Sequence, residues 1–125
     1  MSYTHAVHRY LKALVAVATF VPTAIAAVSC ASLSSLSLSE ARITSAQSVA
    51  AGDFIPPSGA VPTQPIHNLP AFCRVAVTLA PSNDSDIKIE VWMPASGWNG
   101  KFQAVGNGGW SGAVSYSALA SAITC

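Results

Sequence analysis

The chain has 125 residues, the size of a single domain, and a formal net charge of only +1. After residue 26, four basic residues stand against five acidic ones, so this part carries a net charge of −1 and no basic patch. The basic residues are Arg42, Arg74, Lys88 and Lys101, and the acidic residues are Glu40, Asp53, Asp84, Asp86 and Glu90. This balance argues against nucleic acid as a partner.

Residues 1–26 have the pattern of a cleavable export signal. A basic segment without acidic residues comes first, and it contains His5, His8, Arg9 and Lys12. The apolar run at 13–21 is much shorter than the roughly 20 residues that cross a bilayer, and Pro22 ends it. Ala24 and Ala26 supply the small residues that signal peptidase requires. We expect cleavage after Ala26 and a secreted or periplasmic product without a membrane anchor; an uncleaved anchor is the weaker alternative.

Three cysteines follow the expected signal, and an exported chain meets oxidising conditions. A disulfide between Cys30 and Cys73 would hold the N-terminal leader to the sheet and stabilise the fold by about 3–4 kcal/mol. Cys125 has no obvious partner, which suggests that its partner and more sequence follow. The residues before Cys30 lack the leucine of a lipidation motif, so lipidation of Cys30 is not expected.

Residues 27–70 are expected to form an irregular leader rich in serine and proline. Residues 42–49 could be extended, but their periodicity does not decide between helix and strand. Five prolines between residues 52 and 70 indicate an irregular surface connection. His67 lies in this connection, and we expect it to be solvated and not catalytic, because nothing near it in the sequence could orient the imidazole.

The next segment predicts an antiparallel hairpin. Apolar residues alternate along 73–79 and again along 87–93, and the turn-forming residues 81–85 separate the two runs. Asp84 and Asp86 resemble two calcium ligands, but the glycine and glutamate of a calcium loop do not follow at the required spacing. We therefore interpret both aspartates as turn formers and expect no metal site here.

A third strand is expected at residues 101–105, followed by a loop with glycines at 106, 108, 109 and 112. Residues 116–123 suit a helix, with Ser115 or Ser117 near its N-cap. Hairpin, strand, glycine loop and helix follow one another at the start of an α/β-hydrolase sheet, where the loop after the third strand contributes to the oxyanion hole. The loop could be a simple tight connection, but four glycines exceed the need of a turn, and we favour a loop whose backbone N–H groups bind an oxyanion.

Ser111 almost completes a G-x-S-x-G motif, the nucleophile elbow of α/β-hydrolases. The match fails at Ala113, and the serine follows the third predicted strand instead of lying at a strand-to-helix elbow deep in the fold. Ser111 is therefore not expected to be a nucleophile.

Four blocks of sequence resemble the start of the tannase and feruloyl esterase family. The blocks are residues 69–75 (Leu-Pro-Ala-Phe-Cys-Arg-Val), 85–94 (Ser-Asp-Ile-Lys-Ile-Glu-Val-Trp-Met-Pro), 98–102 (Trp-Asn-Gly-Lys-Phe) and 106–110 (Gly-Asn-Gly-Gly-Trp). They occur in order, and the resemblance extends from about residue 30 to residue 125. Family members are secreted serine esterases with an α/β-hydrolase core and a large inserted lid. The resemblance thus implies a phenolic ester, feruloyl or galloyl, as substrate.

The resemblance also implies roles for individual residues. Gly108 or Gly109 would give a backbone N–H to the oxyanion hole, and Cys30 would be bonded to Cys73. The catalytic triad and the lid with its structural calcium lie further along in the family and have no counterpart here, so this chain itself is expected to carry neither a cofactor nor a metal.

We therefore expect an N-terminal fragment of an α/β-hydrolase, inactive alone: residues 1–26 the signal, 27–70 the leader and 71–125 the first strands with the oxyanion loop. The alternative is a small secreted binding module, held together by its disulfide and without catalysis. The sequence leaves the oligomeric state open.

Overall fold

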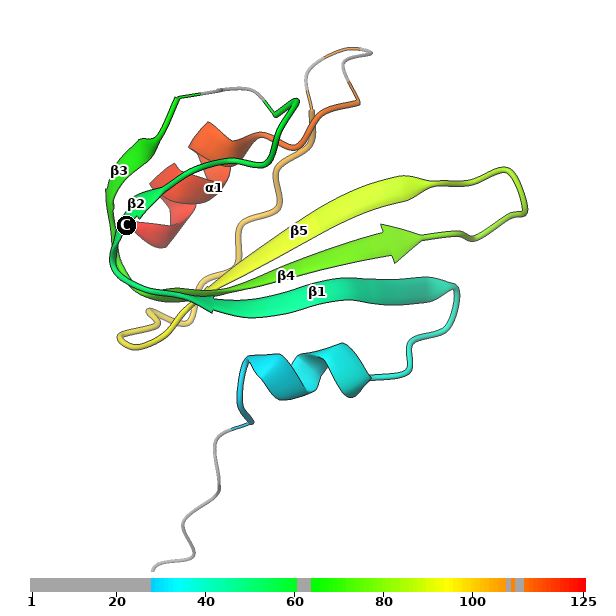
Figure 1. The fold of residues 1–125 in the computed structure, drawn as a ribbon, viewed down its shortest axis with the longest axis horizontal. Coiled ribbons are helices and arrows are strands. Elements are labelled where there is room, and N and C mark those ends of the chain that lie inside the picture. Colours follow the sequence, from blue (N-terminus) through cyan, green and yellow to red (C-terminus); the bar gives the residue numbers. More distant parts are fainter. Residues whose placement is uncertain (1–27, 61–63, 108, 110–111) are drawn as a thin grey trace, which may run out of the picture.

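The computed structural model describes residues 28–60, 64–107, 109 and 112–125 (Figure 1). The expected export signal at 1–26 lies outside this part. The elements in chain order are the 3₁₀-helix η1 (Ala31–Ser35), the strands β1 (Ala41–Val49), β2 (Gly52–Phe54), β3 (Ile66–Leu69), β4 (Phe72–Leu79) and β5 (Ile87–Pro94), and the helix α1 (Tyr116–Ile123). The described part of the chain is thus dominated by antiparallel sheet, with one short α-helix.

The predicted hairpin is confirmed as β4 and β5. The two strands pair antiparallel along their whole length, from Phe72 opposite Pro94 to Leu79 opposite Ile87. Inside the turn, the Ser82 hydroxyl donates a hydrogen bond of 2.7 Å to Asp84. Period-2 alternation on both sides of a polar turn specifies the register, because a slip of one residue would reverse the two faces.

The periodicity of residues 42–49 did not decide between helix and strand. In the structure they belong to β1, which pairs antiparallel with β4 and completes a sheet of order β1-β4-β5. The register shifts between Ile43 and Ser45, where Thr44 turns its hydroxyl to the carbonyl of Ala76 at 3.1 Å. The β1 segment is a strand because β4 offers it a full row of backbone donors and acceptors.

The expectation of an irregular leader at 27–70 is wrong. Besides η1 and β1, the proline-rich part contains the two-stranded β2–β3 sheet, with Gly52 opposite Leu69 and Phe54 opposite Ile66. All the prolines of this segment lie between or after the two short strands, so no ladder hydrogen bond is lost to them. Phe54 and Leu69 are buried, and this segment therefore supplies part of the core.

The expected third strand at 101–105 is absent from the structure. These residues have no strand partner within the described part of the chain, and all are exposed, with Phe102 84 % exposed. The turn before them is present: the indole of Trp98 donates to the carbonyl of Lys101 at 2.9 Å. A strand needs a hydrogen-bonded neighbour, and β5, which the chain leaves at Pro94, is not paired with this segment.

Opposite faces of the long sheet carry different layers (Figure 1). On one face, α1 and the β2–β3 sheet cover an aromatic core. Its buried members are Phe54, Leu69, Phe72, Tyr116 and Ala120. Trp92 stacks on Phe72 in this core, with ring centroids 4.3 Å apart. The other face carries η1.

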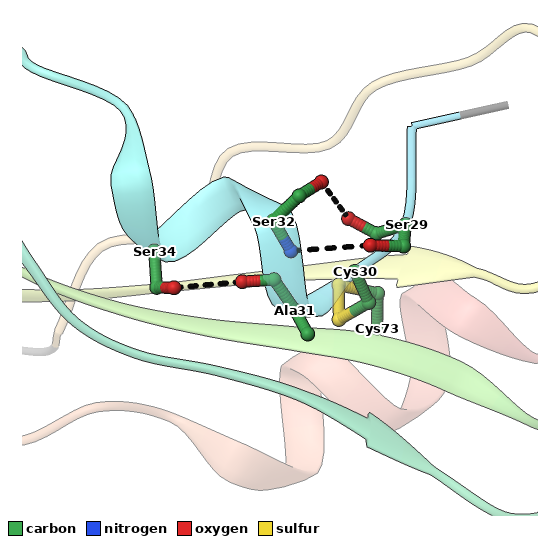
Figure 2. Close-up of a disulfide and its surroundings, with 6 residues drawn as sticks. All are labelled: Ser29, Cys30, Ala31, Ser32, Ser34 and Cys73. Carbon is green, nitrogen blue, oxygen red and sulfur yellow. Dashed lines mark hydrogen bonds between the residues drawn. A yellow bond between two sulfur atoms is a disulfide. The ribbon is translucent and has the colours of Figure 1, made fainter. Parts of the chain in front are cut away.

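The Cys30–Cys73 disulfide joins η1 to the sheet, as the resemblance implied (Figure 2). Cys73 follows Phe72 on β4 and therefore points to the face opposite the aromatic core. The serines of η1 use their hydroxyls locally: Ser32 donates to Ser29 and Ser34 donates to Ala31, each to a carbonyl at 2.7 Å. None of the residues of η1 is buried, so the disulfide is its firmest attachment.

Candidate functional site: the glycine loop and the Glu90 cluster

Two glycines of the loop adopt a backbone conformation that favours glycine. Gly109 has φ +56° and Gly112 has φ +60°. A Cβ at either position would meet no atom within 4 Å, so the backbone angle and not crowding explains the residue type. Gly109 is also exposed, which leaves its surroundings open to a ligand. Gly108 and Ser111 lie outside the described residues.

An open groove of about 470 Å³ lies between the first half of β5 and the glycine loop. One wall is residues 86–90, and the other consists of residues 105–107, residues 112–115 and Leu119 on α1. The groove therefore borders the start of α1, where the chain passes from the glycine loop into the helix.

Three side chains, from β4, β5 and α1, donate hydrogen bonds to Glu90 on β5. Arg74 on β4 donates to both carboxylate oxygens, through Nε to Oε2 at 2.9 Å and through Nη2 to Oε1. The Tyr116 hydroxyl on α1 donates to Oε1 at 2.7 Å, and the Trp92 indole donates to Oε2 at 3.0 Å. We call these four residues the Glu90 cluster. Only 6 % of the Glu90 side chain is exposed, so each of these donors replaces water.

The hydrogen bonds of the cluster keep Glu90 ionised. Burial alone would raise the pKa of its carboxyl group, but the hydrogen bonds from Arg74, Tyr116 and Trp92 and the charge of Arg74 lower it below its ordinary value. Burial and the hydrogen bond to Glu90 raise the pKa of Tyr116 to about 12. The hydrogen bond to Glu90 likewise raises the pKa of Arg74, against the effect of burial. Carboxylate, guanidinium and neutral phenol therefore coexist at neutral pH.

The Glu90 cluster was not predicted, although part of it could have been. The length of the hairpin places Arg74 diagonally from Glu90 on one face, and a buried pair of opposite charges could have been inferred from that register. Tyr116 could not have been assigned to Glu90, because 25 residues lie between them and most of these belong to no helix or strand of the described structure.

His67 has a partner that the sequence did not suggest. Pairing of β2 with β3 brings its Nδ1 to 2.9 Å from a carboxylate oxygen of Asp53. The expectation that nothing orients this histidine is therefore wrong. Both side chains are about 60 % exposed, however (62 % and 59 %), and no hydrogen bond in the described part of the chain joins His67 to a serine or cysteine. Asp53 thus orients His67, but within the described residues no serine or cysteine is bonded to the imidazole as a nucleophile would be.

The remaining candidates are simple to place. Asp84 lies in the hairpin turn, and Asp86 forms an exposed ion pair with Lys88. Within the described residues no three metal-binding side chains come together. Ser115 lies at the N-cap of α1, but its side chain makes no capping hydrogen bond. Cys125 is exposed and free, with its Sγ 3.1 Å from the carbonyl of Ser121.

No helix in the described ranges has the length and hydropathy to cross a membrane.

Comparison with known proteins finds relatives named as esterases, which confirms the resemblance to the feruloyl esterase family over the matched parts of the chain. Over 113 residues, 90 % of the chain, it is 41 % identical to an uncharacterized esterase of Xanthomonas campestris. Over 48 residues, 38 % of the chain, it is 46 % identical to a probable feruloyl esterase B-1 of Aspergillus flavus. Over 56 residues, 45 % of the chain, it is 43 % identical to a probable feruloyl esterase B-1 of Aspergillus oryzae.

The chain spans only a small part of these relatives: 19 % of the bacterial protein, 9 % of the Aspergillus flavus protein and 10 % of the Aspergillus oryzae protein. No family model matches the chain, and no solved structure matches it.

Proposed function

We propose that the chain is the N-terminal part of an exported carboxylic ester hydrolase with an α/β-hydrolase fold. The observation that carries this proposal is the identity of 41 % to a protein named as an esterase over 90 % of the chain. We propose a phenolic ester, feruloyl or galloyl, as the substrate; the shorter matches to probable feruloyl esterases support the feruloyl alternative. The serine, histidine and acid of the triad would follow residue 125.

In this proposal the described residues bind the oxyanion and do not attack the ester. A serine outside the chain adds to the ester carbonyl, and negative charge develops on the carbonyl oxygen. The N–H of Gly109 or that of Gly108 donates to that oxygen and lowers the barrier. The positive φ of Gly109 and the open space around it support this role. No residue of the Glu90 cluster takes part in proton transfer, because the carboxylate is already saturated with donors.

Export is part of the proposal, and its support is the pattern of residues 1–26 together with the disulfide of the structure. N-terminal sequencing of exported material should find a chain that begins after Ala26. Exported material that still begins at Met1 would contradict the cleavage.

Two measurements test the enzyme directly. The coding DNA beyond codon 125 should continue and encode a G-x-S or C-S-x-G-G elbow, and the complete product should hydrolyse methyl ferulate or methyl gallate. The 125-residue chain should not hydrolyse either ester above the buffer rate. A stop codon directly after Cys125 would instead favour the binding module. Turnover by the short chain that disappears in Ser111→Ala would show that the nucleophile has been misplaced.

A further inference from the structure

The start of α1 follows the glycine loop and has no side-chain cap of its own. An N-cap serine ordinarily accepts a hydrogen bond from the first turn, but Ser115 makes none. Its backbone carbonyl accepts from Leu119 at 3.1 Å, and the N–H of Tyr116 donates to Val114 at 3.2 Å. Neither bond connects the helix to the sheet. The first side chain that does so with directional bonding is Tyr116.

Tyr116 contacts the sheet through both its ring and its hydroxyl. The ring lies in the aromatic core, with its centroid 6.0 Å from Phe54 and 6.2 Å from Trp92. The hydroxyl donates to Oε1 of Glu90, 26 residues earlier in the chain. Ring packing fixes the depth of the helix, but a hydrogen bond to one oxygen also fixes its rotation and its position along the sheet.

The carboxylate is a rigid acceptor because its other bonds orient it. Arg74 holds both oxygens, Trp92 holds Oε2, and Arg74 itself lies over the ring of Phe54 with Cζ 5.6 Å from the centroid. A planar guanidinium bonded to both oxygens leaves the carboxylate little freedom to rotate. Tyr116 is thus bonded to an oxygen whose position β4 and β5 already determine.

The groove makes this geometry relevant to the glycine loop. Glu90 lines one wall, and residues 112–115, which directly precede Tyr116, line the other. We propose that Glu90 is a positioning residue: through Tyr116 it sets the place of residues 112–115 and so the shape of the groove beside the glycine loop. Its consequence for catalysis rests on the proposed ester hydrolase, but the positioning itself is a property of this chain alone.

Backbone hydrogen exchange of the full 125-residue chain tests the positioning. Tyr116→Phe removes the hydroxyl and keeps the ring, and Glu90→Gln keeps the size of the side chain and removes the charge. Either change should accelerate exchange of the amides of Tyr116 and Leu119, which donate to the carbonyls of Val114 and Ser115, by about tenfold, with a much smaller change in β1 and β4. That factor corresponds to a local loss of about 1.4 kcal/mol, within the range for a hydrogen bond to a charged group.

Two control variants distinguish positioning from a general loss of stability. Ser121→Ala removes a hydroxyl from α1 that bonds only to Ser117 within the helix, at 3.0 Å, and should leave exchange of the Tyr116 and Leu119 amides unchanged. Leu69→Ala, in the core but not in the groove wall, should accelerate exchange throughout the sheet. If Tyr116→Phe leaves exchange of the Tyr116 and Leu119 amides unchanged, or accelerates exchange in all regions as Leu69→Ala does, Glu90 does not act as a positioning residue.

The complete enzyme supplies the second readout. Tyr116→Phe should lower kcat for methyl ferulate with little change in KM, because substrate contacts remain while the groove wall is less ordered. An unchanged kcat together with selective exchange would overturn the link to catalysis. The unmodified complete protein could also hydrolyse no ester while Tyr116→Phe still accelerates exchange only at the start of α1. That result would support the positioning and contradict the proposed function.

Discussion

Tyr116 gives the Glu90 cluster a spectroscopic signal of its own. The chain has three tyrosines, and Tyr3 and Tyr10 precede the expected cleavage site, so residues 27–125 contain Tyr116 alone. Phenolate absorbance of the cleaved chain therefore reports a single group. This makes the environment of one buried hydroxyl measurable without any labelling.

We predict that Tyr116 ionises near pH 12 in the folded chain, against 10.0 for an ordinary tyrosine. Burial and the bond to Glu90 favour the neutral phenol, so the pKa is raised. The stability this contributes is fully present below pH 10 and is lost as the pH rises through about 12. Absorbance titration of residues 27–125 measures the pKa directly.

Glu90→Gln is the informative comparison for this titration. It removes the negative charge beside the phenol, so the pKa of Tyr116 should move down toward 10.0 while burial keeps it from reaching that value. Lys88→Gln, which removes a charge from an exposed side chain of the same strand, should leave the titration unchanged. A Tyr116 that titrates near 10 in the unmodified folded chain would contradict the buried bond to Glu90.

At the scale of elements, the disulfide is the clearest source of stability outside the aromatic core. It closes a loop of 43 residues between Cys30 and Cys73 and attaches η1, none of whose residues is buried. A bridge that closes a loop of this length lowers the entropy of the unfolded chain.

Replacing both cysteines by serine should lower the free energy of unfolding by about 3–4 kcal/mol. Denaturant unfolding followed by tryptophan fluorescence measures this, since Trp92 lies in the core. Cys125→Ser, at the exposed free cysteine, is the control and should change the stability by less than about 0.5 kcal/mol. Equal stability of the double-serine variant and the unmodified chain would show that the bridge does not constrain the fold.

The elements also show where sequence reasoning succeeds. The hairpin of β4 and β5 and the helix α1 could be predicted because alternation, turn residues and helix-forming residues are local signals. The short strands β2 and β3 could not, since their prolines suggested an irregular segment and their pairing depends on a contact across residues 54–66. The strand expected at 101–105 was wrong, because its prediction used local apolar residues alone. In the described structure this segment has no partner strand.

The same distinction applies to the candidate site. The glycine loop was recognised from composition, and the positive φ values of Gly109 and Gly112 agree with the choice of glycine there. The disulfide followed from a family resemblance. The Glu90 cluster and the Asp53–His67 pair were missed because both depend on pairing between strands, which places side chains together that no local pattern connects.

On the scale of the whole molecule, the described sheet carries α1 and the β2–β3 sheet on one face and η1 on the other (Figure 1). The chain covers 19 % of its bacterial relative, so the sheet and the groove would form one corner of a much larger enzyme in our proposal. The glycine loop borders the groove at the edge of the sheet, where β5 has a free edge among the described strands. Gly109 is exposed, so in our proposal its N–H is accessible to a substrate that later segments would hold.

The most direct test of the central claim is the kcat of Gly109→Pro in the complete protein, with methyl ferulate or methyl gallate as substrate. Proline removes the N–H of residue 109, so kcat should fall by about a hundredfold or more, the usual scale for one lost oxyanion donor. Gly59→Pro is the matched control, because Gly59 also has a positive φ of 84° and lies in an exposed turn away from the groove. It should carry a similar backbone strain and keep the kcat of the unmodified enzyme. If Gly109→Pro folds and retains full kcat, and Gly108→Pro does the same, the glycine loop is only a connection and not part of an oxyanion hole.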